Sequence, residues 1–321
     1  MGPVLCLFSA ACFGAMAIFG KLAYSAGVTP SALLLLRFTL AAVLLAGLLV
    51  LRPGLRAAPA GHRPPRGPLG IPGPLVVTGL GLGAVGFATQ AVLYFGALER
   101  IDASLVVLVL YTYPLLVTVG AALVGRDRLT PGRVVALVLA SCGTLLVLLG
   151  AGGMSFDLLG VALAFGSAVT YTGYILVADT VVDRVPPVVL AALVMTGASL
   201  TLGARAVMSG GIDLGFGPDG WLWIGCITVV STVLAMLAFF AGLRRTGPSA
   251  AAIMSMFEPV VTTGLAALTL DEFLTPVQLA GALVVLSSAA LVQLRPRRRQ
   301  AVPSAEQADV VTPAAEPVPL G

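Results

Sequence analysis

Residues 97–131 read ALERIDASLVVLVLYTYPLLVTVGAALVGRDRLTP, and residues 242–276 read GLRRTGPSAAAIMSMFEPVVTTGLAALTLDEFLTP. The two stretches align without a gap at an offset of 145 residues, and 11 of the 35 aligned positions are identical. The matched pairs include Pro114 with Pro259 and Thr118 with Thr263. The gapless register and the paired prolines indicate an internal repeat.

The composition places the chain in a lipid bilayer. Of its 321 residues, 58% are hydrophobic and only 10% are charged, and its mean hydropathy is +1.04. A soluble domain carries about 25% charged residues, so this chain has too little polar surface to face water. Its solvent is therefore the bilayer. The net charge of +4 is modest and gives no indication of nucleic-acid binding.

Ten apolar segments are long enough to cross a bilayer as helices, which takes about 20 residues. We expect them at about 3–24, 31–51, 72–97, 102–124, 131–150, 156–178, 187–208, 220–243, 248–270 and 275–294. A Pro/Gly/Arg-rich loop at 52–74 separates the second segment from the third. The Pro/Ala/Glu-rich tail at 296–321 has little to bury and is predicted to be disordered.

The ten segments divide into two halves of five. A second offset, of 157 residues, superposes Pro30 on Pro187, and each of these prolines opens the second helix of its half. The longer 52–74 loop accounts for the difference between the two offsets. We therefore predict an all-α integral membrane protein whose ten transmembrane helices form one repeat at 1–150 and another at 151–295, followed by a cytoplasmic tail.

Lysine and arginine mark the cytoplasmic side of a membrane protein. If the N-terminus is cytoplasmic, the inside collects fourteen of these residues: Arg52, Arg56, Arg63, Arg66, Arg126, Arg128, Arg133, Arg184, Arg244, Arg245, Arg295, Arg297, Arg298 and Arg299. The outside keeps three, Lys21, Arg100 and Arg205. This bias predicts a multi-pass protein of the cell (plasma) membrane with both termini in the cytoplasm.

An odd number of helices in each half requires the second half to be inverted relative to the first. The repeat supports this independently, because Glu99 aligns with Arg244 and the pair Arg126-Asp127 aligns with Asp271-Glu272. Equivalent loops thus change the sign of their charge. Inverted repeats commonly build transporters, in which the substrate site lies at the midplane between the halves.

One arrangement of residues includes Lys21 and Arg37-Phe38 together with two features that occur in both halves. These features are the prolines Pro114 and Pro259, and the acids Asp127 and Glu272, each acid being followed after one residue by Leu-Thr-Pro. In this arrangement, over about residues 4–295, the chain resembles the ten-helix EamA branch of the drug/metabolite transporter superfamily. The resemblance implies secondary transport, often export, of amino acids, other small metabolites or drugs. Asp127 stands where the pattern usually has Glu, so the resemblance assigns it no role.

The paired prolines predict two broken helices. Proline removes one backbone hydrogen bond and frees the carbonyl four residues earlier, which is Leu110 for Pro114 and Ser255 for Pro259. In a membrane, a freed carbonyl is tolerated where it is buried in protein or lines a cavity. We expect a central cavity between the fourth and ninth segments, the alternative being a kink that serves packing alone.

Glu258 is the one acid well inside a segment, and its repeat partner is Tyr113. Ionisable groups within a membrane are costly and point to function. Because removal from water disfavours a charged carboxylate, Glu258 is the candidate for binding and releasing a coupling proton. Two alternatives remain open: a static pair with Arg37 or Lys21, and a protonated acid that only donates a hydrogen bond.

Other residues could line the substrate site. Arg37 and Lys21 could attract an anionic group of the substrate, although Lys21 is close enough to its helix end to extend into the interface instead. The candidates for the wall of the cavity are polar or aromatic: Gln90, Tyr94, Tyr111, Tyr113, Tyr171 and Tyr174. Taken singly, each of these is also compatible with ordinary packing.

The sequence argues against other chemistry. An intramembrane enzyme needs a nucleophile–base pair, paired acids or a metal cluster, whereas the single histidine, His62, lies in a loop. A phosphate-binding Walker loop is absent from the sequence. The four cysteines fall in apolar runs and are expected to be buried, inert thiols. We expect no cofactor and no metal. The alternative to a transporter is a lipid scramblase or a structural membrane protein. The oligomeric state stays open.

The charge bias yields a first test. A reporter that is active only outside the cell should be inactive when fused after Leu294, and one that is active only in the cytoplasm should be active there. Activity of the external reporter at this position would overturn the predicted orientation.

Overall fold

The computed structural model describes residues 1–56, 72–98, 100–101, 106, 109–126, 130–149, 157–269 and 275–294. Within these ranges the chain is helical and contains no strand. The tail predicted to be disordered, most of the 52–74 loop, and the acids Asp127 and Glu272 lie outside the described residues.

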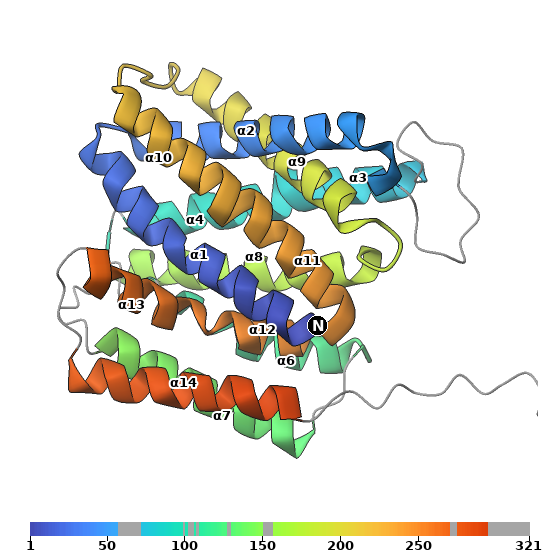
Figure 1. The fold of residues 1–321 in the computed structure, drawn as a ribbon, viewed down its shortest axis with the longest axis vertical. Helices are drawn as coiled ribbons and strands as arrows, with labels where there is room; N and C mark the ends of the chain where they lie inside the picture. Colours follow the sequence, from blue (N-terminus) through green and yellow to red (C-terminus); the bar gives the residue numbers. More distant parts are fainter. Residues whose placement is uncertain are drawn as a thin grey trace, which may run out of the picture.

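The helices lie side by side in one bundle, with α7 and α14 paired along one edge (Figure 1). Their bounds are α1 Gly2–Ser25, α2 Pro30–Leu51, η1 Pro53–Arg56, α3 Gly73–Gly81, η2 Leu82–Phe87, α4 Ala88–Leu98, α6 Tyr113–Leu123, α7 Pro131–Leu149, α8 Leu158–Val181, α9 Pro187–Met208, α10 Pro218–Thr228, η3 Val229–Leu234, α11 Ala235–Thr246, α12 Pro248–Ser255, α13 Glu258–Thr269 and α14 Pro276–Leu294.

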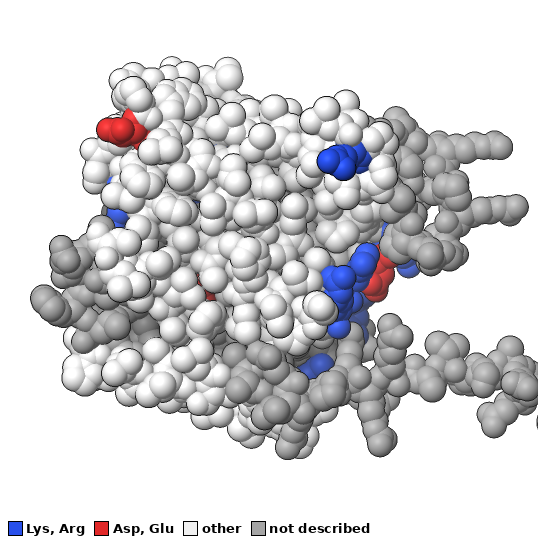
Figure 2. Space-filling view, in the orientation of Figure 1, with Lys and Arg blue, Asp and Glu red and all other residues white. Residues whose placement is uncertain are grey.

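The length and composition of these helices suit a bilayer. Six continuous helical stretches of the described chain are long and apolar enough to span one, and shorter apolar helices accompany them. Large apolar side chains such as Val77, Leu123 and Leu268 are exposed on the outside of the bundle. On the face shown in Figure 2, charged side chains gather toward the two ends. The predicted all-α integral membrane fold is confirmed.

Proline and short polar caps begin the helices. Pro30 is the first residue of α2, after Thr29, whose side chain accepts a hydrogen bond from the Ala32 amide at 3.4 Å. Asp157 caps α8 by accepting from the Leu159 amide at 3.2 Å. Proline suits a first turn because the amide hydrogen it lacks would have no partner within the helix.

The first helix of each half packs against helices of the other half. Helix α1 packs against α10, α11, α12 and α13 of the second half, whereas α8 packs against η2, α4 and α6 of the first. Helices of equal rank also pair, α2 with α9 and α7 with α14. Contacts between the two halves therefore hold the bundle together.

Two π-helical segments, which the sequence analysis did not predict, interrupt long helices. Segment η2 separates α3 from α4, and η3 separates α10 from α11. In η3, the Thr232 hydroxyl donates to the carbonyl of Ile227, five residues earlier, at 3.0 Å. Such widened turns mostly occur as single insertions within α-helices, frequently at functional sites.

Small residues allow α9 to lie directly on the η2 region. A Cβ built on Gly83 would collide with the Val194 carbonyl, and one on Gly197 would collide with the Leu80 carbonyl. Each of these glycines therefore lets the two backbones approach, as is common where membrane helices cross closely.

The expectation for the cysteines is only partly correct. Cys6 and Cys12 are buried, whereas Cys142 is exposed and Cys226 is partly exposed. The error has a simple cause, since in a membrane protein an apolar run supplies the surface that faces lipid as well as the core.

The close crossing predicts a clear loss of stability. Gly197→Val should lower the melting temperature of the detergent-solubilised protein, because overpacking costs about 1–3 kcal/mol and here the obstacle is backbone. Gly47→Val is the matched control, since a Cβ at Gly47 would meet no atom within 4 Å. Equal melting temperatures for the two variants would contradict the close α9–η2 contact.

Candidate functional site

Two membrane helices are broken at equivalent positions. The turn at Tyr111-Thr112 precedes α6, and the turn at Met256-Phe257 precedes α13. The two turns are related by the same offset of 145 residues that relates the prolines. Pro114 and Pro259 each occupy the second position of the helix that follows the turn. Proline cannot donate the hydrogen bond that would have continued the preceding helix.

The two breaks lie against each other. Helix α12 contacts α6, and the hydroxyl of Tyr113 lies within hydrogen-bonding reach of the Ser255 side chain at the end of α12. The hydroxyl of Tyr111 lies within reach of the Glu258 carboxyl group. We call Tyr111, Tyr113, Ser255 and Glu258 the break site. At this site, polar side chains from the two copies of the repeated stretch lie beside each other.

Glu258 is positioned by the break itself. As the first residue of α13, it lies where backbone amides lack helical partners and where the helix dipole favours a negative charge. Its side chain is partly buried. The groups around it are mainly tyrosine hydroxyls, which can donate to a carboxylate and can accept from a carboxylic acid.

Further tyrosines surround the break site. The rings of Tyr113 and Tyr171 are 4.8 Å apart, and those of Tyr171 and Tyr174 are 5.8 Å apart and stacked. Tyr94 from α4 and Tyr171 from α8 also lie near Glu258. Five of the six predicted wall residues are thus connected to one another or to Glu258.

Aromatic contacts extend away from this group. Tyr174 packs on Phe87 at 5.4 Å between ring centroids and on Phe240 at 6.5 Å. Phe87 in turn meets Phe38 edge to face at 5.4 Å. A continuous row of rings therefore leads from the break site to Phe38 on α2, the residue that follows Arg37.

Gln90, the sixth predicted wall residue, holds two helices together. Its side-chain nitrogen donates to the Ser167 hydroxyl at 3.2 Å, and that hydroxyl donates to the Gln90 carbonyl, also at 3.2 Å. The amide therefore links α4 to α8. Leu110 is partly buried and packs against the main hydrophobic core.

Arg37 is buried, with 7% of its surface exposed. Its guanidinium carbon lies 4.3 Å from the centroid of the Phe38 ring, and one terminal nitrogen donates to the Met16 sulfur. Within the described chain Glu258 forms no ion pair with Arg37, so the structure shows no static pair between these two residues. Lys21 is exposed near the end of α1, as expected for a side chain that reaches the interface.

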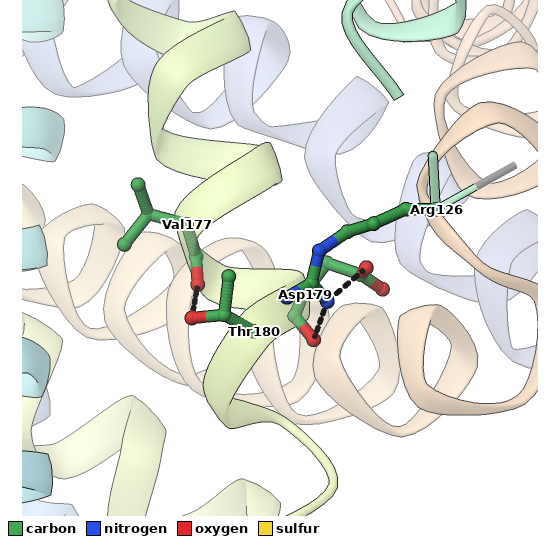
Figure 3. A network of polar contacts seen from close by, with 4 residues as sticks. All are labelled: Arg126, Val177, Asp179 and Thr180. Carbon is green, nitrogen blue, oxygen red and sulfur yellow. Dashed lines mark hydrogen bonds and ion pairs between the residues drawn. The ribbon is translucent and has the colours of Figure 1, made fainter. Parts of the chain in front are cut away.

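Ion pairs hold both ends of α8 to the first half. Near its C-terminal end, Asp179 accepts from Arg126 at 3.1 Å through its carboxylate and at 3.4 Å through its carbonyl, beside the bond from Thr180 to Val177 (Figure 3). At the opposite end, Arg100 lies 3.5 Å from Asp157. The Arg100–Asp157 pair is solvent-exposed, and exposed pairs typically contribute about 0–1 kcal/mol, whereas Asp179 is mostly buried.

Sequence reasoning missed several residues of this region. Tyr24 and Met16 on α1 approach Arg37, and Phe87 and Phe240 complete the row of rings. A methionine or a phenylalanine within an apolar run carries no signal of its own, and its partners lie far away in the sequence. No group of three metal-binding side chains occurs among the described residues.

The chain resembles known membrane transporters. The EamA-like transporter family matches it twice, at residues 1–149 and 158–294. Among curated proteins, the uncharacterized transporter YcbK of Bacillus subtilis (strain 168) is 27% identical over 287 residues, covering 87% of this chain and 88% of YcbK. The uncharacterized transporter YwfM of the same strain is 25% identical over 174 residues, covering 53% and 57% of the two chains.

A solved structure described only as "Crystal structure of protein" shares the fold. Its TM-score is 0.75 at 21% sequence identity, and the match covers 91% of this chain and 96% of the other. The family and its relatives are transporters, so the expectation of a transporter instead of an enzyme is confirmed. Because the family match spans nearly all of the predicted membrane segments, this chain belongs to the EamA-like transporter family.

Proposed function

We propose that this transporter exports amino acids or other small metabolites or drugs by alternating access, and that Glu258 couples transport to protons. The break site carries the proposal. An acid there begins a helix, faces the broken helix of the other repeat, and has tyrosine hydroxyls around it. Tyrosine hydroxyls can donate to the charged carboxylate and accept from the neutral acid, so they suit a group that changes its charge.

The proposed architecture is a pair of inverted repeats. The two turns at the same offset support it, as do the exchanged positions of α1 and α8 and the two separate family matches. In such transporters the substrate lies near the midplane, where broken helices from the two repeats meet. The break site is the corresponding place in this bundle.

We also propose that both termini are cytoplasmic and that the protein resides in the cell membrane. The start of α1 lies at the same end of the bundle as the ends of α2, α6 and α11 (Figure 1). Arginines follow or close these three helices, at Arg52, Arg126, and Arg244 with Arg245. This end therefore carries the charge that marks the cytoplasmic side.

Proton coupling follows from the position of Glu258. When the carboxyl group is protonated, the site is neutral and can reorient at low electrostatic cost; when it is charged, it attracts a cationic group of the substrate or the next proton. Moving one charge through the membrane potential supplies about 2.3 kcal/mol per 100 mV. That is roughly a fifty-fold concentration ratio, since 1.4 kcal/mol corresponds to a factor of ten.

The break should matter more for transport than for folding. Pro259→Ala restores the amide hydrogen that could continue α12 into α13, so it should lower transport several-fold while leaving the melting temperature within a few degrees of the wild type. Transport is measured as efflux of preloaded labelled amino acids from cells, with Pro276→Ala at the exposed start of α14 as the control. Full efflux by Pro259→Ala would show that the break is dispensable.

Glu258→Gln tests the coupling. Glutamine keeps the shape and most hydrogen bonds of the side chain but cannot change its charge, so the variant should lose accumulation against a gradient and keep downhill exchange. The measurement is uptake into proteoliposomes with and without a pH gradient, and Glu258→Asp should retain partial coupling. Uphill accumulation by Glu258→Gln with unchanged pH dependence would make the carboxyl group structural.

A further inference from the structure

Arg37 buries a positive charge without an anionic partner among the described residues. A thioether sulfur accepts from one of its terminal nitrogens, an aromatic ring lies beside it, and its Nε has no hydrogen-bond partner. Thioether sulfur is a weak acceptor, whereas a guanidinium group offers five N–H donors. A buried charge left uncompensated is strongly destabilising. The arrangement is therefore incomplete without an anion.

Two hydroxyl groups with the same deficiency lie on the neighbouring helix. Thr228, the last residue of α10, and Ser231, in η3, are buried, and neither hydroxyl has a hydrogen-bond partner. Elsewhere in the bundle such hydroxyls usually donate to a carbonyl of their own helix, as Thr118 does to Pro114 at 2.7 Å and Ser255 to Ala251 at 3.0 Å. Within η3, the neighbouring Thr232 does donate to a carbonyl of its own helix, that of Ile227.

These groups belong to one interface. Leu33 of α2 forms a buried cluster with Ile224 and Ile227 of α10, and Leu40 and Met16 pack against the same cluster. Arg37 lies one turn after Leu33 and one turn before Leu40. Thr228 and Ser231 each follow one of the two isoleucines by four residues, in segments that contact α2. Two other unpartnered hydroxyls, those of Thr144 and Ser249, lie on α7 and α12.

We propose that Arg37, together with Thr228 and Ser231, binds an oxyanion group, a carboxylate or a phosphate, of the transported solute. This assignment rests on the proposed transport function and specifies part of its substrate. A guanidinium group binds two oxygens of such an anion side by side, and the two hydroxyls supply further donors. The Phe38 ring and the Met16 sulfur hold the plane of the guanidinium group in place.

The surroundings connect this oxyanion site with both the exposed end of α1 and the break site. Tyr24 is 41% exposed near that end, beyond Lys21, and it lies near Arg37. Tyr94 lies near both Tyr24 and Glu258. Neighbouring side chains therefore link Arg37 through Tyr24 and Tyr94 to Glu258.

Binding at equilibrium tests the assignment without requiring transport. The melting temperature of the full chain, purified in detergent, is measured in sodium acetate and in inorganic phosphate. The reference for each is acetamide with sodium chloride at equal ionic strength. A specific anion should raise the melting temperature by a few degrees, as about 1 kcal/mol of binding does for a chain of this size. The rise should be absent in Arg37→Gln, partial in Arg37→Lys, and unchanged in Arg205→Gln, whose arginine is exposed.

The variants without anion separate a binding role from a structural one. Arg37→Gln removes an uncompensated charge, so its own melting temperature should equal or exceed that of the wild type. Thr228→Val and Ser231→Ala should each weaken the binding of acetate or phosphate about five-fold, the loss expected from one hydrogen bond of about 1 kcal/mol.

Three results would overturn the proposal: no anion-specific rise in the wild type, an equal rise in Arg37→Gln, or a large loss of stability in that variant without anion. The outcome is independent of the coupling mechanism. If Glu258→Gln keeps the anion-specific rise while retaining uphill transport, the oxyanion site stands and proton coupling at Glu258 fails. If coupling behaves as proposed and the rise is missing, the oxyanion site fails alone.

Discussion

Backbone hydrogen bonding constrains every part of this molecule. Hydrocarbon offers no partner for an amide or a carbonyl group, so a chain in a bilayer must satisfy these groups within helices. A break in a helix is tolerated only where protein surrounds it. Both broken helices of this chain meet that condition, because α12 packs against α6 and each break lies beside the other. The position of the candidate site follows from this constraint, since irregular backbone and polar side chains are tolerated in the same sheltered place.

Polar side chains in the bundle also need hydrogen-bond partners, and among the described residues some find them within the protein while others do not. Gln90 and Ser167 satisfy each other across two helices, and most hydroxyls return to a carbonyl of their own helix. Arg37, Thr228 and Ser231 do not complete their bonding in this way. What sets these three residues apart is that they lie along the same helix contact, and hydropathy alone does not reveal this.

Much of the fold could be predicted from the sequence, because helix length and charge asymmetry are local properties. The repeat also placed both prolines at helix breaks, since its register carries over from one copy to the other. The contacts of Glu258 with Tyr111 and of Tyr113 with Ser255 could not be derived, because each joins residues more than 140 positions apart. The π-helical segments were missed for another reason: one extra residue in a turn leaves the apolar composition unchanged.

Arg37 and Glu258, both within the described part of the chain, do not pair with each other in this bundle. A direct pair would satisfy both charges and would leave neither available for binding, because opening a buried pair is costly. Here Glu258 has tyrosine hydroxyls and Arg37 has a sulfur and an aromatic ring, with a row of rings between them. Each charge is thus held by partners too weak to neutralise it. A proton could complete the site at the acid, and an oxyanion could complete the site at the guanidinium group. Both partners are exchangeable, as transport requires.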